Sequence, residues 1–165
     1  MATPTGGRNT VEFLINRNRL EQIAGKAASE SAFLLLDRAT RRLLTAAGGL
    51  EVGDAEGAFS AAYDAYRMAA EALLICQGLR ATGGDGSHMT VEDAISAQYS
   101  TSIVAFAKPT FERFRRTRHT VQYFDPSAAE ITEDDALWAL ATARGAVEGV
   151  NYVLRNDPPG LYQPG

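Results

Sequence analysis

Apolar residues recur along most of this chain at intervals of three and four positions, which is the spacing of one face of an α-helix. No segment alternates with a period of two, so we expect no β-strand. The pattern predicts a single-domain, all-α bundle of five to six helices, mostly antiparallel. We expect these helices to begin or run as follows: from Thr10, over 29–47, over 55–76, from Thr90, over 109–124, and from Thr132 to about 156.

Capping residues, proline and glycine predict several of the helix ends. Asp54 fits an N-cap, and Pro109 fits the first turn of its helix. Thr90–Asp93 and Thr132–Asp135 both resemble capping boxes. Gly48–Gly49 is predicted to stop the second helix.

Beyond the helical domain, which we place at 10–156, both ends are rich in glycine or proline. Residues 1–9 are expected to be flexible, and residues 157–165 are expected to form an exposed coil.

Composition narrows the class of protein. Of the 165 residues, 45% are apolar and 22% are charged, which excludes a disordered tail. No apolar run reaches the roughly 20 residues of a membrane span, and no secretory signal is visible. Cys76 is the single cysteine, so no internal disulfide can form, and we expect a cytoplasmic protein without membrane contact. Two histidines and one cysteine offer no set of metal ligands, and we predict no cofactor.

Charge is unevenly distributed, although the net charge of −4 argues against general coating of nucleic acid. Between residues 108 and 118, five cations stand against the single acid Glu112, a local charge of +4. The acids that follow, after the break at Pro126, are expected to stabilise the start of the last helix. These acids are Glu130, Glu133, Asp134 and Asp135.

Arg118 occupies an apolar slot in a stripe that otherwise contains Phe111, Phe114 and Val121. A guanidinium that faces a core must be paired or must line a cleft, because an unpaired buried charge is costly. Two interpretations stay open: an anion or nucleic-acid site, and a salt-bridge network within the chain or across a dimer.

For the first interpretation, candidate phosphate ligands are Arg113, Arg115 and Arg116, since arginine suits bidentate phosphate contacts. Candidate catalytic residues are Arg118, His119 and Tyr123, the last two being able to move or donate a proton.

Three segments carry a resemblance to a known family. They are the tyrosine- and alanine-rich stretch 63–74, the glycine-rich turn 83–88 with its histidine, and the stretch 118–125, RHTVQYFD. Together they resemble the HEPN family, helical domains found in bacterial toxins, defence systems and partners of nucleotidyltransferases. The resemblance covers about 29–156.

Many HEPN proteins are metal-independent endoribonucleases and dimers. Their motif is an arginine, usually a polar residue next, and a histidine after four to six intervening positions. In the best register Arg118 takes the arginine position, His119 the polar one, and Tyr123 stands where the histidine is expected. Two other pairs are possible. Arg113 and His119 have a permitted number of residues between them, but their side chains lie roughly 120° apart around a helix. Arg115 and His119 share one face of a helix, but one residue too few lies between them.

The resemblance therefore implies a homodimer that binds RNA or a nucleotide phosphate and cleaves RNA as a toxin or defence protein does. It also implies an antitoxin, or a nucleotidyltransferase that modifies Tyr123, as a partner. The alternative is a non-catalytic helical module in which the arginines contact a partner. The glycine-rich loop before His88 lacks a P-loop lysine and is interpreted as a plain connection, and Tyr63 and Tyr66 as core or interface residues.

Overall fold

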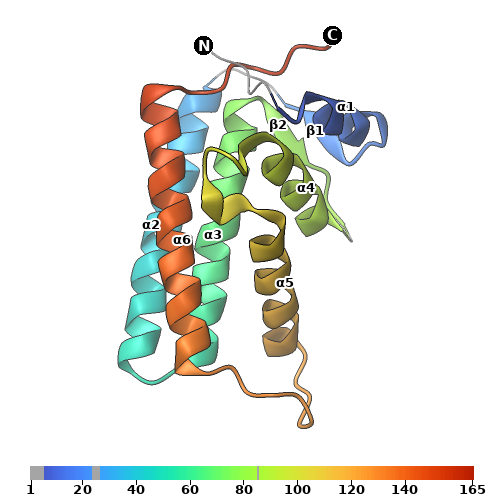
Figure 1. Ribbon diagram of the computed structural model, residues 1–165. Helices are drawn as coiled ribbons and strands as arrows, with labels where there is room; N and C mark the ends of the chain where they lie inside the picture. The colour runs from blue at the N-terminus through green and yellow to red at the C-terminus, as the bar shows by residue number, and fades with distance from the viewer. Residues whose placement is uncertain (1–5, 24–26, 85) are drawn as a thin grey trace.

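The computed structural model describes residues 6–23, 27–84 and 86–165, and it is dominated by helices (Figure 1). They are α1 (Arg8–Asn16), α2 (Ala28–Glu51), α3 (Ala55–Cys76), α4 (Ser87–Tyr99), α5 (Lys108–Gln122) and α6 (Glu133–Asn156). A 3-10 turn, Val104–Phe106, joins α4 to α5, and two short strands, β1 (Leu20–Gln22) and β2 (Leu79–Ala81), complete the described elements. The predicted all-α bundle is confirmed.

Helix α3 is the centre of the molecule. The long helices α2 and α6 pack along it, while α4 and α5 cover another side, and α1 with the β1–β2 pair lies near one end of the bundle (Figure 1). Because α3 is enclosed on several sides, it is apolar around most of its circumference, as expected for a buried helix. Its many buried alanines let the neighbouring helices approach closely.

Aromatic side chains fasten α5 and α6 onto α3. The ring of Phe114 on α5 lies with its centroid 4.4 Å from that of Tyr66 and 4.8 Å from that of Trp138. Tyr66 is fully buried and donates a hydrogen bond to the Ala105 carbonyl oxygen at 2.7 Å. The interpretation of Tyr66 as a core residue is therefore confirmed, and α5 is held in a fixed orientation on α3.

Helix α2 does not stop at Gly48–Gly49 as predicted but continues to Glu51. A Cβ atom on Gly49 would lie 3.1 Å from the backbone nitrogen of Ala58, so this glycine serves the close approach of α2 and α3. The chain turns instead at Gly53, whose φ of 79° suits glycine.

The two predicted capping boxes have different outcomes. Thr132 and Asp135 form the reciprocal hydrogen bonds that open α6, at 3.1 Å and 2.9 Å. The box at Thr90 is wrong, because α4 begins earlier, at Ser87, and the Thr90 hydroxyl donates to the Gly86 carbonyl oxygen from within the helix. The Asp54 cap is confirmed, since its carboxylate accepts from the Gly57 backbone N–H at 2.9 Å.

The absence of strands was also predicted wrongly. β1 and β2 pair antiparallel, with Leu20 opposite Ala81. Each strand has three residues, which is too short for an alternating pattern to be recognised in the sequence.

The ends of the chain are more ordered than expected. α1 begins at Arg8, and residues 1–5 of the expected flexible segment lie outside the described residues. Residues 157–165 are coil, but this coil packs on the end of α3: Pro159 is buried, and the Tyr162 N–H donates to the Gln77 carbonyl oxygen at 2.9 Å.

No helix in the described part of the chain combines the length and the apolar character that crossing a bilayer requires.

Candidate anion-binding site

The cations of the arginine-rich segment point to two different sides of α5. Arg115 lies against α4, where it meets Glu92, whereas Arg113 and Arg116 line a shallow surface depression beside residues 129–131. The predicted phosphate ligands Arg113, Arg115 and Arg116 therefore do not form one cluster.

Acids neutralise most of this segment. Four of its five cations have a carboxylate within 4 Å: Lys108 with Asp93 at 3.0 Å, Arg113 with Asp135 at 3.8 Å, Arg115 with Glu92 at 3.3 Å, and Arg116 with Glu112 at 3.9 Å. Two of these acids come from α4 and one from α6, so three of the four pairs depend on the fold and are invisible as a local sequence pattern, whereas Glu112 and Arg116 lie four residues apart on α5. For these four cations, the salt-bridge interpretation describes the structure.

Arg115 and Glu92 form the most deeply placed of these pairs. Only 3% of the Glu92 side chain is exposed, against 36% of the Arg115 side chain. Burial raises the pKa of the Glu92 carboxyl, while the charge and the hydrogen bond of Arg115 lower it. Arg115 thus offsets part of the effect of burial on this carboxylate.

Arg118 differs from the other four cations. Its side chain is half-buried, and among the described residues no carboxylate lies within ion-pair distance. Its Nε atom is buried and has no hydrogen-bond partner in that same part of the chain. Among the described residues Arg118 is therefore a cation with unmet hydrogen-bonding capacity. Its place in the apolar stripe predicted that it would be paired or would line a cleft, and no such pair is formed in the described part of the chain.

Arg118 lies one helical turn after Phe114 on α5, and the Phe114 ring packs against the Tyr63 ring of α3, with their centroids 5.7 Å apart. The charge of Arg118 acts to lower the pKa of Tyr63 and that of His88 on α4. The Tyr63 hydroxyl and His88 Nδ1 share a hydrogen bond of 2.8 Å, and their rings are nearly parallel, at 12°. Partial burial lowers the pKa of His88, and the charges of Arg67 and Arg118 lower it further. Burial raises the pKa of Tyr63, so both rings are neutral near pH 7.

Arg67 completes this group from α3. It pairs with Glu71 at 2.8 Å and more weakly with Asp64 at 3.9 Å, yet its Nε, like that of Arg118, is buried without a partner among the described residues. We call Tyr63, Arg67, His88 and Arg118 the α3–α4–α5 cluster.

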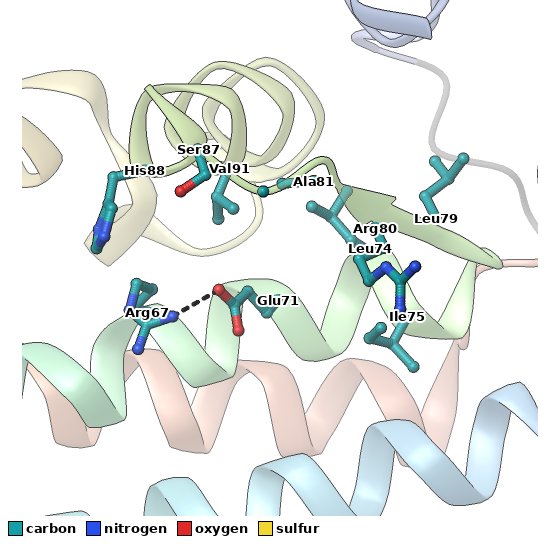
Figure 2. A pocket seen from close by; sticks show the side chains of 11 residues that line it. Arg67, Glu71, Leu74, Ile75, Leu79, Arg80, Ala81, Ser87, His88 and Val91 are labelled. Carbon is teal, nitrogen blue, oxygen red and sulfur yellow. Dashed lines mark hydrogen bonds and ion pairs between the residues drawn. The ribbon is translucent and has the colours of Figure 1, made fainter. Parts of the chain in front are cut away.

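A pocket of about 290 Å³ opens beside this cluster, between α3, β2 and α4 (Figure 2). Figure 2 shows Arg67 and His88 at one end of the pocket, with Glu71 joined to Arg67 by an ion pair. The remaining wall is mostly apolar, and it consists of Leu74, Ile75, Leu79, Ala81 and Val91.

The structure places the other predicted catalytic residues outside the cluster. His119 and Tyr123 are exposed near the C-terminal end of α5, with their ring centroids 4.7 Å apart. Tyr123 follows the last residue of α5 in an extended conformation, and 59% of it is exposed. Of the three residues predicted to be catalytic, Arg118 alone lies in the cluster.

Sequence reasoning missed Tyr63, Arg67 and His88 as site residues. One signal was present: Tyr63, Arg67 and Glu71 are four residues apart and place polar groups on one face of a helix that is otherwise apolar. No such signal predicted that His88 lies close to Tyr63, because this depends on where the turn after β2 places the start of α4.

In the described ranges, no three His, Cys, Asp or Glu side chains are arranged as metal ligands. Comparisons of the chain with family models, with curated proteins and with solved structures give no match.

Proposed function

We propose that this chain is a HEPN-like protein that binds RNA through a phosphate contact at Arg118. The observation that carries the proposal is that Arg118 has no ion-pair partner among the described residues, while the four other cations of its helix segment are paired. A phosphate oxygen would supply the missing counter-charge and hydrogen bonds, and arginine offers several N–H donors to it.

The neighbours of Arg118 suit an anion. Tyr63 and His88 present a hydroxyl and a ring nitrogen, and Arg67 adds a second guanidinium. If the Tyr63 hydroxyl donates to Nδ1, the neutral His88 ring carries its proton on Nε2 and can donate it to a phosphate oxygen. The cluster then binds an anion without needing a charged histidine.

Fluorescence anisotropy with a labelled single-stranded RNA tests this proposal. We expect Arg118→Ala to weaken binding at least tenfold, the value of one lost charge-assisted hydrogen bond of about 1.5–3 kcal/mol. Arg116→Ala is the matched control, because it removes the same charge from an exposed position of the same helix, and we expect a change below about twofold. Equal effects of the two substitutions, or no RNA binding by the wild type, would refute the phosphate site.

A second candidate function is metal-independent cleavage of the bound RNA, favoured by the neutral His88 beside Arg118. In such a reaction the ribose 2′-oxygen attacks the phosphorus, the bond from phosphorus to the 5′-oxygen breaks, and a 2′,3′-cyclic phosphate forms. This step needs the other tautomer of His88, in which Nδ1 donates to the Tyr63 hydroxyl oxygen and Nε2 is unprotonated. Nε2 would take the 2′-hydroxyl proton, and the leaving 5′-oxygen would gain a proton from water. Arg118 would stabilise the charge on the phosphate oxygens.

Incubation of RNA with the protein in chelator tests cleavage directly. The proposal predicts that His88→Ala and Arg118→Ala abolish cleavage, whereas the resemblance alone predicts that His119→Ala or Tyr123→Phe does so. Cleavage that both His88→Ala and Arg118→Ala leave intact would exclude the cluster as the active site.

The alternative function is a non-catalytic module for a partner, and it has its own support at the end of α5. Tyr123 and Phe124 are 59% and 90% exposed, and Phe124 is too apolar to be a typical surface residue. The resemblance suggests three possible partners: a nucleotidyltransferase that modifies Tyr123, an antitoxin, and a second copy of this chain. Intact mass after co-expression tests the first, and light scattering of the purified protein tests the homodimer.

A further inference from the structure

The pocket between α3, β2 and α4 has a chemistry of its own, separate from the phosphate contact at Arg118. We infer that it binds a small uncharged molecule with an apolar body of about one ring. The end group of this molecule donates a hydrogen bond to Glu71 and accepts one from Ser87. The inference does not depend on the proposed function, since it uses neither Arg118 nor RNA.

The walls of the pocket suit an apolar body. Four lining positions of α3, residues 67, 71, 74 and 75, lie on one side of that helix. Leu74, Leu79 and Val91 are buried, while Ile75 and Ala81 are half-buried and remain accessible to a ligand. A ligand that covers these two side chains removes apolar surface from water, which is favourable.

The size of the pocket limits that body. Its volume of about 290 Å³ lies near the lower end of the range for small-molecule sites, roughly 300–1,000 Å³. A single ring with a short substituent fits such a space.

The charged groups of the pocket already have partners. Arg67 contacts Glu71 at 2.8 Å, and at the other end Arg80 contacts Glu21 at 2.6 Å. Because the two cations are matched by two acids, a charged ligand would lose hydration without gaining an unpaired counter-charge. The pocket therefore favours an uncharged ligand.

Two groups at the polar end of the pocket have hydrogen-bonding capacity to spare. The Arg67 guanidinium contacts Oε1 of Glu71, and the described residues form no hydrogen bond to Oε2. The Ser87 hydroxyl likewise has no hydrogen-bond partner in the described part of the chain, and Figure 2 shows Ser87 of α4 across the pocket from Glu71 of α3. A carboxylate only accepts, whereas a hydroxyl can donate, so the two groups fit a donor beside an acceptor.

Arg67 and His88 line the same end, and we assign them no contact with this ligand. Arg67 is held by Glu71, and His88 shares its hydrogen bond of 2.8 Å with the Tyr63 hydroxyl. Glu71 and Ser87 therefore determine the end group. A primary amide has the required form, because its NH₂ group donates and its carbonyl oxygen accepts.

Backbone amide NMR of the full chain, titrated separately with benzamide, acetophenone, benzoate and benzylamine, tests the inference. Acetophenone keeps the ring and the carbonyl of benzamide but has a methyl group in place of the NH₂ group. We expect benzamide to shift the signals of 79–81 and of Ser87, and to bind about tenfold more tightly than acetophenone, the value of one hydrogen bond to a charged group. Benzoate and benzylamine should bind more weakly than benzamide, because their charges find no unpaired partner.

The other outcomes each overturn a part of the inference. Unchanged signals of 79–81 with benzamide would overturn the site itself. Equal affinities of benzamide and acetophenone would overturn the contact with Glu71, and benzoate or benzylamine binding as tightly as benzamide would overturn the preference for an uncharged ligand. No RNA is present in this experiment, so its failure leaves the phosphate site at Arg118 standing.

Three variants locate the ligand. Ala81→Phe fills the pocket and should abolish benzamide binding, whereas Ala141→Phe on the exposed surface of α6 should not. Glu71→Leu removes the acceptor and should erase the preference for benzamide over acetophenone, with Glu148→Leu on the surface of α6 as its control. Ser87→Ala should weaken both ligands alike, by about threefold, since both keep the carbonyl. A tenfold preference retained in Glu71→Leu would refute the role of the carboxylate even if Ala81→Phe fails to fold.

Discussion

Arg115 and Arg116 are neighbours in the sequence, yet α5 places them in opposite environments. Arg115 holds the buried Glu92 carboxylate, while Arg116 is 73% exposed and lies 3.9 Å from Glu112 on the same helix. Exposed pairs of this kind contribute little to stability, but removing one partner of a buried pair leaves an uncompensated charge.

We therefore predict that Arg115→Ala lowers the free energy of unfolding by about 3 kcal/mol near pH 7, and Arg116→Ala by less than about 0.5 kcal/mol. Urea denaturation of the two variants measures the difference. The loss in Arg115→Ala should shrink as the pH falls, because burial without Arg115 raises the pKa of Glu92 further and the protonated carboxyl carries no unpaired charge. Equal losses in the two variants would show that Glu92 is not buried as described.

His88 predicts a pH dependence with a definite sign. Its pKa in the folded protein lies below the ordinary value of 6.5, so the unfolded chain takes up the proton first as the pH falls. The contribution of His88 to stability is therefore complete above pH 6.5 and is lost as the pH falls through and below that value.

We expect the free energy of unfolding to fall less in His88→Gln than in the wild type as the pH is lowered from about 7.5 to about 5.5. The urea midpoint at each pH measures this. Other groups, including Glu92 with its raised pKa, titrate in both proteins and cancel in the difference. Parallel curves for His88→Gln and wild type would contradict the assigned pKa direction.

At the scale of helices, the capping box at Thr132 fixes where α6 begins. Its Asp135 has a second contact, 3.8 Å from Arg113, and the Arg113 guanidinium lies 3.8 Å over the Trp138 ring. The start of α6 is thus tied to α5 across the loop of residues 123–132.

Thr132→Ala should lower the free energy of unfolding by about 1 kcal/mol, because one backbone N–H of α6 loses its acceptor. Thr120→Ala on α5 is the control: its hydroxyl donates to a carbonyl oxygen within a formed helix, and we expect a change within about 0.5 kcal/mol. Thermal or urea unfolding measures both, and a cost for Thr132→Ala no larger than that of the control would contradict the cap.

Helices were predictable from the sequence because their signals are local. The three-four spacing of α3, the caps at Asp54 and Thr132 and the inner stripe of α6 each depend on residues a few positions apart. The end of α2 was predicted too early, because Gly49 permits the close approach of α2 to Ala58 on α3 and does not stop the helix. The start of α4 was predicted too late, because the helix begins directly after Gly86, whose φ is 87°, and not at the expected box.

For the whole molecule, the distribution of charge could be predicted only in part. The sequence identified the cations of 108–118 and the anomalous place of Arg118, but the acids that neutralise the others, Asp93, Glu92 and Asp135, lie on other helices. Tyr63 and His88 were unpredictable as site residues for the same reason, since packing of α3 and α4 brings His88 to Tyr63 and Tyr63 to Phe114 on α5.

The salt dependence of RNA affinity tests most directly the claim that Arg118, which has no ion-pair partner among the described residues, contacts a phosphate. Each phosphate contact to a single strand contributes about 0.7 to the slope of log affinity against log salt concentration. We predict that Arg118→Ala reduces this slope by about 0.7 and that Arg116→Ala leaves it unchanged. Identical slopes for wild type and Arg118→Ala would contradict the claim.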